Sequence, residues 1–92
     1  MKIYISGKVT GLKNPQSKFQ KTEKMLRNMG YWVVNPTKLC TEDCTWKEAM
    51  KICLAELITC DAIYVQSDWG TSRGSKLEIL KAQKHGLEII FE

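Results

Sequence analysis

Length, composition and charge place this chain among ordinary small globular proteins. It has 92 residues, of which 43% are hydrophobic and 26% are charged, and its net charge is +4. These values exclude a disordered or fibrous chain, and we expect one domain, residues 1–92, with a modest core. Because the lysines are scattered, no nucleic-acid polymer is expected as a partner, whereas a small anionic ligand such as a nucleotide fits the mild positive charge.

Targeting signals and cysteines bear on the compartment. The apolar run at residues 1–5 is too short for a signal-peptide core, and no run approaches the roughly 18 apolar residues of a membrane span. We therefore expect a cytoplasmic protein without membrane contact. In a reducing compartment its cysteines are expected to be free thiols; they are Cys40, Cys44, Cys53 and Cys60. The C-x3-C spacing of the first two leaves a zinc site as an alternative, but no metal or cofactor is predicted.

The first half of the chain predicts two strands around a helix. Residues 2–6 form a short β-rich run that ends at Gly7. Residues 15–29 repeat apolar side chains at helical spacing, and Gly30 follows where a left-handed C-cap belongs. The stripe of this helix is Phe19, Thr22, Leu26 and Met29. Residues 31–34 predict the second strand, which Pro36 ends.

The second half continues the alternation. After a polar loop through residue 44, Thr45 and Glu48 form a capping box that opens a helix to about residue 59. The stripe of this helix is Trp46, Ala49, Met50, Cys53 and Leu57. Residues 62–65 lack polar alternation, as a buried parallel strand does. A loop, a helix over residues 72–85 capped by Gly86, and a last strand over residues 87–91 follow.

This order predicts the fold class and the place of the site. Strands that alternate with helices through right-handed crossovers form an α/β three-layer sandwich with a short four-stranded parallel sheet, either Rossmann-like or flavodoxin-like. Ligands of such sheets bind beyond the carboxyl ends of the strands. Two loops reach that edge, residues 7–11 after the first strand and residues 67–74 after the third.

The first of these loops begins with Gly7 and Lys8 and matches neither the Walker spacing nor the G-x-G-x-x-G fingerprint. Gly7 lets backbone N–H groups approach a ligand, or it serves only a tight turn. In the second loop, Ser72, Arg73 and Gly74 stand at the start of a helix with Thr71 and Ser75 beside them. Free N–H groups, hydroxyls and a guanidinium form a phosphate cradle there, the alternative being an N-cap with a solvated arginine.

Glu78 lies one turn further along this helix. The helix dipole is expected to favour its ionised form, which suits a carboxylate nucleophile; the alternative is an exposed surface glutamate. Asp68, near the end of the third strand, is the best-placed second carboxylate. Tyr4 and Trp69 are candidates to flank a base, or else core and rim aromatics.

Several motifs run in one order along the whole chain. They are Met1-Lys-Ile-Tyr-Ile-Ser-Gly7, Val33-Val34-Asn35-Pro36, Thr45-Trp46, Cys60-Asp61-Ala62-Ile63-Tyr64, and Trp69 with Ser72-Arg73-Gly74 and Glu78. In this series the chain resembles a family of small, largely uncharacterised phage and bacterial proteins related to the nucleoside 2-deoxyribosyltransferases. The wider superfamily includes the 2′-deoxynucleoside 5′-monophosphate N-glycosidases. The resemblance implies a deoxynucleoside or deoxynucleotide as ligand and, for so short a chain, a homodimer or higher homo-oligomer.

The resemblance also implies roles for particular residues. Glu78 matches the glutamate of S-x-G-x-x-x-E, which attacks C1′ of the deoxyribose and expels the base. The covalent glycosyl-enzyme intermediate is then resolved by water or by a second base. Ser72 and Gly74 match residues that approach the 5′ end of the nucleotide. Tyr4 matches the tyrosine of the first strand, and Gly7 the loop after it.

One position departs from this pattern. Relatives commonly carry an aspartate eight residues before the position of Asp61, where it handles protons at the leaving base, and this chain has Cys53 there. A thiol with a pKa of about 8.5 is a poor substitute for a tuned carboxyl group, and Cys53 also falls on an apolar stripe. Two hypotheses follow: an enzyme that cleaves or exchanges the N-glycosidic bond, and a module that binds a nucleotide without turning it over.

Overall fold

Four parallel strands form one sheet in the order β2-β1-β3-β4 in the computed structural model, which describes residues 1–40 and 43–92. The strands are β1 (Lys2–Ser6), β2 (Trp32–Val34), β3 (Ala62–Val65) and β4 (Glu88–Phe91). The helices are α1 (Pro15–Asn28), α2 (Trp46–Leu57) and α3 (Arg73–Lys84), with short 3₁₀ helices η1 (Pro36–Lys38) and η2 (Trp69–Thr71). The predicted order of elements and the predicted fold class are confirmed. The predicted loop before α2 includes residues 41 and 42, which lie outside the described residues.

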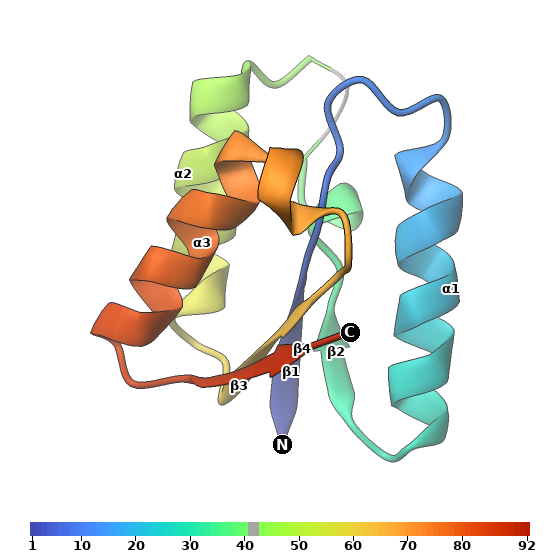
Figure 1. The fold of residues 1–92 in the computed structure, drawn as a ribbon, viewed down its shortest axis with the longest axis vertical. Helices are drawn as coiled ribbons and strands as arrows, with labels where there is room; N and C mark the ends of the chain where they lie inside the picture. Colours follow the sequence, from blue (N-terminus) through green and yellow to red (C-terminus); the bar gives the residue numbers. More distant parts are fainter. Residues whose placement is uncertain (41–42) are drawn as a thin grey trace.

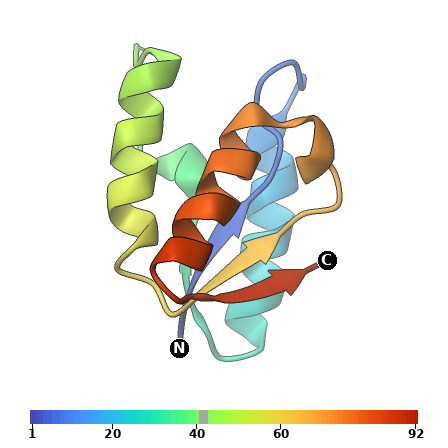
Figure 2. The ribbon, with the colours of Figure 1, turned by 60° about the vertical axis from the view of Figure 1, so that its left-hand side comes forward.

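The layers follow from the two faces of β1. Alternate side chains of a strand point to opposite faces of the sheet. Ile3 and Ile5 therefore pack with Phe19 under α1, whereas Tyr4 belongs to the core cluster that α2 and α3 cover. Figures 1 and 2 show α1 on one side of the sheet and the other two helices on the opposite side. Ser6 follows Tyr4 with the same parity, so both side chains face α3.

The strand order places the switch point of the sheet at β1 and β3. β1 pairs with β2 through Ile3 and Val33 and with β3 through Ile5 and Tyr64. The chain therefore leaves β1 toward one edge of the sheet and returns on its other side. In flavodoxin-like sheets of this order, a crevice opens at the carboxyl ends of the two strands where the direction reverses.

Local capping explains where the helices begin and end. Thr45 Oγ1 accepts from the Glu48 N–H at 3.1 Å, and Glu48 Oε1 accepts from the Thr45 N–H at 3.3 Å, so the predicted capping box is confirmed. Ser72 Oγ caps α3 by accepting from the Ser75 N–H at 3.1 Å. Gly30 follows α1 at φ +91°, the left-handed region that glycine enters without a steric penalty.

Two members of the predicted apolar stripes are exposed. Met29 is 62% exposed, because it stands at the C-cap of α1, where the helix has already ended. Trp46 is 40% exposed, because it is the first residue of α2 and extends past the core. Glu23, by contrast, is buried within α1, where hydrogen bonds from Arg27 and Asn35 satisfy its carboxylate.

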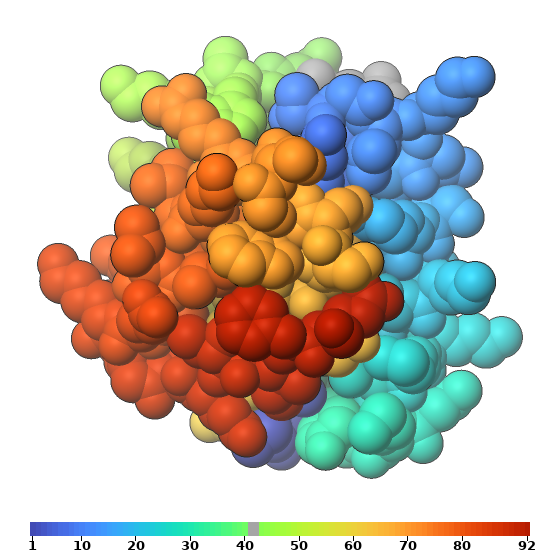
Figure 3. All heavy atoms as spheres, viewed as in Figure 1, coloured from blue at the N-terminus to red at the C-terminus, as the bar shows by residue number. Residues whose placement is uncertain are grey.

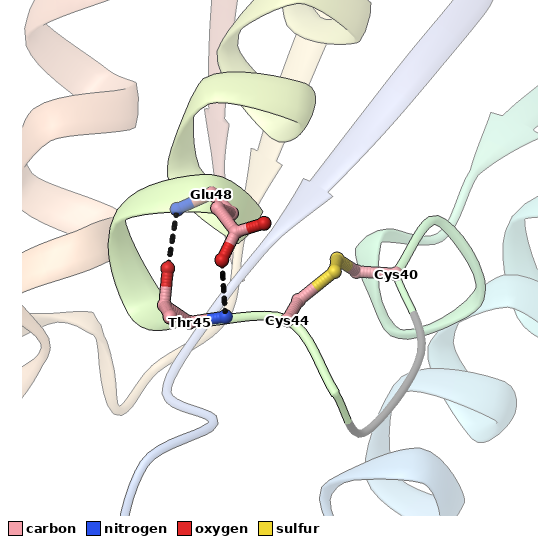
Figure 4. The surroundings of a disulfide bond; sticks show 4 residues. All are labelled: Cys40, Cys44, Thr45 and Glu48. Atoms are coloured by element: carbon pink, nitrogen blue, oxygen red, sulfur yellow. Dashed lines mark hydrogen bonds between the residues drawn. A yellow bond between two sulfur atoms is a disulfide. The ribbon is translucent and has the colours of Figure 1, made fainter.

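The prediction of four free thiols is wrong for two of them. Cys40 and Cys44 form a disulfide beside the capping box of α2, as Figure 4 shows, while Cys53 and Cys60 are free and buried. The two Cα atoms are 6.2 Å apart, within the range that a disulfide requires. The zinc alternative needs these sulfurs as ligands, whereas here they bond to each other. In the described part of the chain, no helix combines the length and apolar character that a membrane crossing requires.

Candidate functional site

A buried carboxylate, that of Glu78, lies at the centre of the candidate site. Its side chain projects from α3 toward the sheet and is only 5% exposed. The Tyr4 hydroxyl donates to Glu78 Oε2, and Ser6 Oγ donates to Oε1 at 2.7 Å. Because both donors come from one face of β1, the strand holds the carboxylate in a single orientation. The alternative of an exposed surface glutamate is thereby excluded.

Burial dominates the ionisation of this carboxylate. It raises the pKa of Glu78 to about 7, although the hydrogen bonds from Tyr4 and Ser6 act in the opposite direction. We expect the helix dipole to favour the ionised form, but the net shift of the Glu78 pKa is upward, so this expectation is wrong. The dipole fades within the first turn of a helix, and Glu78 lies beyond it. Burial, and then the charge of Glu78, hold the pKa of Tyr4 well above its usual range, so the phenol remains a donor.

Glu78 lines a cavity of about 550 Å³ at the carboxyl edge of the sheet. The walls come from the loop after β1, from η1, and from the first turns of α2 and α3. Most of the predicted site residues lie on these walls, namely Gly7, Lys8, Ser72, Arg73, Gly74 and Glu78. Residues remote in the sequence are therefore brought to one cavity, in the crevice that the strand order predicts.

Three predicted residues lie elsewhere. Tyr4 is fully buried behind Glu78 and contacts the site only through it. Asp68 pairs with Lys18 at 2.5 Å and accepts from the Lys8 N–H at 3.1 Å, so it ties the first loop to α1 and to the loop after β3. These two loops meet at the surface in Figure 3, blue against orange. Trp69 packs against Phe91 of β4 with ring centroids 5.8 Å apart and does not line the cavity.

The glycine after β1 is required by close packing. A Cβ at Gly7 would lie 2.0 Å from Gln66 Oε1, since the chain leaving β1 runs against the end of β3. Any larger residue there displaces the buried Gln66. Gly7 therefore allows the two loops to approach each other, and its backbone also lines the cavity.

Sequence reasoning missed two residues of the site, Ser6 and Trp46. Ser6 was detectable, because it follows Tyr4 at the two-residue spacing of a strand face. The apolar stripe predicts Trp46 as a core residue, whereas its ring lies on the cavity wall, with its centroid 4.3 Å from the Arg73 guanidinium. Ser75, which the sequence does place beside the predicted phosphate cradle, is fully buried on the same wall, and its Oγ has no hydrogen-bond partner among the described residues. The Trp46–Arg73 contact has no local signal in the sequence, because it depends on how α2 and α3 pack.

Cys53 belongs both to the core and to the site. It is 7% exposed, packs in the cluster of Tyr4 and Leu57, and also lines the cavity. Burial raises the pKa of its thiol, while a hydrogen bond with Tyr4 lowers it and the nearby Glu78 raises it further. The thiol is therefore protonated at neutral pH and adjoins the Tyr4–Glu78 pair.

The charges of the cavity are divided between its rim and its floor. Lys8 and Arg73 stand on the walls, and neither forms an ion pair with any of the described residues. Glu78 is the acidic residue among those that line the described cavity. The N-termini of α2 and α3 add partial positive charge to the same rim. The cavity thus combines an anion-attracting rim with a carboxylate at its floor.

Comparison with known proteins agrees with this architecture. The model of a family described as a domain of unknown function, DUF4406, matches residues 1–91. A 2-deoxyribosyltransferase from Bacillus psychrosaccharolyticus has a similar structure, with a TM-score of 0.75 and 17% identity over 99% of this chain and 71% of the other. The Clostridium botulinum CMP N-glycosidase BcmB is also similar, with a TM-score of 0.69 and 18% identity over 99% and 67%. No curated protein matches the sequence. The similarity confirms the fold that the resemblance implies.

Proposed function

This chain belongs to the DUF4406 family, and we propose that it cleaves or exchanges the N-glycosidic bond of a 2′-deoxynucleoside or its 5′-monophosphate, with Glu78 as the nucleophile. The observation that carries the proposal is the carboxylate at the cavity floor, buried and oriented by Tyr4 and Ser6. The solved structures of similar fold, a deoxyribosyltransferase and a CMP N-glycosidase, support the same class of bond.

The reaction follows from the position of Glu78. A carboxylate oxygen attacks C1′ of the deoxyribose, the C1′–N bond breaks, and its electron pair leaves with the base. The two hydrogen bonds from β1 hold the carboxylate in place. Each oxygen keeps a further lone pair that is free to react. Water, or the nitrogen of a second base, then attacks C1′ and releases Glu78. With a pKa of about 7, this group is divided between its acid and its reactive base form at neutral pH.

Cys53 supports a second candidate function, a module that binds a nucleotide without cleaving it. Burial raises the pKa of this thiol, so it transfers a proton to a departing base less readily than a carboxyl group does. In that case the cavity retains a nucleotide, and Glu78 serves as a hydrogen-bond acceptor rather than as a nucleophile.

One experiment separates the two functions. The wild type and Glu78→Gln are incubated with the four common 2′-deoxynucleosides and their 5′-monophosphates, and free base is measured by chromatography. In parallel, the shift in melting temperature reports binding. Base release by the wild type that disappears in Glu78→Gln supports the enzyme. Thermal stabilisation by a nucleotide without base release supports the binding module.

A further inference from the structure

The strongest unassigned feature of the cavity is the contact between Trp46 and Arg73. These are the first residues of α2 and α3, and the guanidinium lies 4.3 Å from the centroid of the indole ring. Both side chains line the cavity, and Arg73 has no carboxylate partner among the described residues. A guanidinium stacked on a ring keeps the N–H donors at its edge free, whereas a bidentate carboxylate would occupy them.

The surroundings of Arg73 favour an anion at this edge. Lys8 stands on the wall of the same cavity without an acidic partner among the described residues. Ser75, two residues after Arg73, is fully buried on that wall, and its Oγ has no partner in the described part of the chain. A buried hydroxyl without a partner is destabilising, and an oxyanion that accepts its hydrogen bond removes this penalty. Two cations and a hydroxyl donor that are unpaired among the described residues thus line the same cavity.

We propose that Trp46 is a positioning residue that holds Arg73 to bind the 5′-phosphate, and that the ligand is a nucleoside 5′-monophosphate rather than the free nucleoside. The nucleoside part of this inference rests on the proposed function. The phosphate part rests on the Trp46–Arg73 contact and on the Ser75 hydroxyl. In this arrangement the rim binds the dianionic end of the ligand, and Glu78 lies deeper, at the sugar.

The test measures binding rather than turnover, in the Glu78→Gln background so that no probe is consumed. The probes are the four 2′-deoxynucleoside 5′-monophosphates, the matching nucleosides, 2-deoxyribose 5-phosphate and inorganic phosphate. Arg73→Ala is expected to weaken monophosphate binding about tenfold or more, since hydrogen bonds to charged groups are strong. Trp46→Leu is expected to weaken it about two- to fivefold. Neither substitution is expected to change the affinity for the nucleosides.

The coupling between the two side chains provides the decisive comparison. In the Arg73→Ala background, Trp46→Leu should cost no further monophosphate affinity. With Arg73 present, Trp46→Phe keeps an aromatic ring and should retain part of the affinity that Trp46→Leu loses. Lys76→Ala is the matched control, because Lys76 is an exposed cation of the same helix turn that does not line the cavity. It should leave the monophosphate preference unchanged.

Substitution of Ser75 provides a second, independent test of the phosphate site. Ser75→Ala removes a buried group that has no partner, so it should keep or raise the melting temperature and yet weaken monophosphate binding. A purely structural role for this serine predicts lower stability and unchanged binding, which would contradict the proposal.

Three further outcomes overturn the inference. Equal affinity for nucleosides and monophosphates excludes a phosphate site. An equal loss of both ligands in Trp46→Leu means that the indole stacks on the base instead. Inorganic phosphate that binds as tightly as the monophosphates means a simple anion site. A retained preference for monophosphates without base release by the wild type contradicts only the glycosidic chemistry, so the two proposals fail separately.

Discussion

Tyr4 and Glu78 are 74 residues apart in the chain, and their side chains share a hydrogen bond in the protein interior. Both are buried, and the phenol keeps its proton because burial and the adjacent carboxylate raise its pKa. The contact joins the central strand β1 to α3 and presents the carboxylate to the cavity. It therefore links the stability of the core to the reactivity of the site.

If Glu78 is the nucleophile, the wild type should form a covalent adduct with a 2′-fluoro nucleotide analogue, whose fluorine slows turnover. Mass spectrometry of the intact protein should show the mass of the fluorinated sugar phosphate, and peptide mapping should place it on residue 78. Glu88→Gln, which neutralises an exposed glutamate of β4, is the control and should label normally. Labelling of Glu78→Gln to the same extent would remove Glu78 from the mechanism.

The hydrogen bond from Tyr4 lowers the pKa of Glu78 from the higher value that burial alone would produce. Tyr4→Phe should therefore move this pKa above about 7. The acid limb of the pH profile of base release should shift to higher pH, because the reactive carboxylate then forms only at higher pH. NMR titration of the labelled carboxyl carbon measures the same shift without turnover. An unmoved titration in a folded variant would show that the phenol does not tune the carboxylate.

Glu23 should stabilise the fold at neutral pH and lose this effect in acid. Burial raises the pKa of Glu23, but hydrogen bonds from Arg27, Lys38 and Asn35 together lower it to about 2 from the ordinary 4.5. Its contribution to the free energy of unfolding is complete above pH 4.5 and is lost as pH falls toward 2. Glu23→Gln should cost about 1–3 kcal/mol at neutral pH and flatten the acid limb of stability.

Glu78 provides the contrast for this measurement. Since its folded pKa is about 7, above the ordinary 4.5, its contribution is complete below pH 4.5 and is lost as pH rises through 7. Glu78→Gln should therefore flatten the neutral limb of stability and leave the acid limb intact. Denaturant titrations of both variants across pH separate the two effects. Identical pH profiles for the two variants would contradict both assignments.

Cys53→Asp tests whether the thiol stands where a proton-handling carboxyl belongs. If so, base release should rise by as much as about 10²–10⁴-fold, the usual contribution of acid catalysis. Stability should fall by about 1–3 kcal/mol, because the new polar group is buried beside Leu57. Turnover is compared at equal folded fraction, with Cys60→Asp as the control for a buried thiol that does not line the cavity. A destabilised variant without gain in turnover supports the binding module.

We expect the protein to assemble as a homodimer or a larger homo-oligomer. A core of this size is small, and large apolar side chains remain outside it; Leu80 of α3 is 61% exposed and Phe91 of β4 is 57% exposed. Phe91 belongs to the edge strand β4, against which α3 packs, and β4 has no second neighbouring strand among the described residues. Sedimentation at micromolar concentration measures the mass. Leu80→Glu should dissociate the assembly, and a monomeric wild type would refute the expectation.

Local interactions explain why so much of the fold was predictable from the sequence. The capping box of Thr45 and Glu48 and the left-handed turn at Gly30 each depend on residues a few positions apart. The buried run over residues 62–65 and its alternation with helices then leave few arrangements other than a parallel sheet with helices on both faces. The same topology predicted that the cavity opens beyond the carboxyl ends of the strands. The family resemblance pointed to Glu78, Ser72 and Gly74, which line it.

Only the tertiary structure decided the chemistry of that cavity. The raised pKa of Glu78 comes from burial under β1, and no local pattern reports burial. The Trp46–Arg73 contact depends on how the first turns of α2 and α3 pack, and the Cys40–Cys44 bond depends on a Cα–Cα distance of 6.2 Å that the C-x3-C spacing does not specify. Asp68 was assigned to the ligand because of its place in the loop, whereas its partner Lys18 lies on another element. The pairs Trp46–Arg73 and Lys18–Asp68 join residues distant in the chain, so their energies depend on a packing that sequence spacing does not describe.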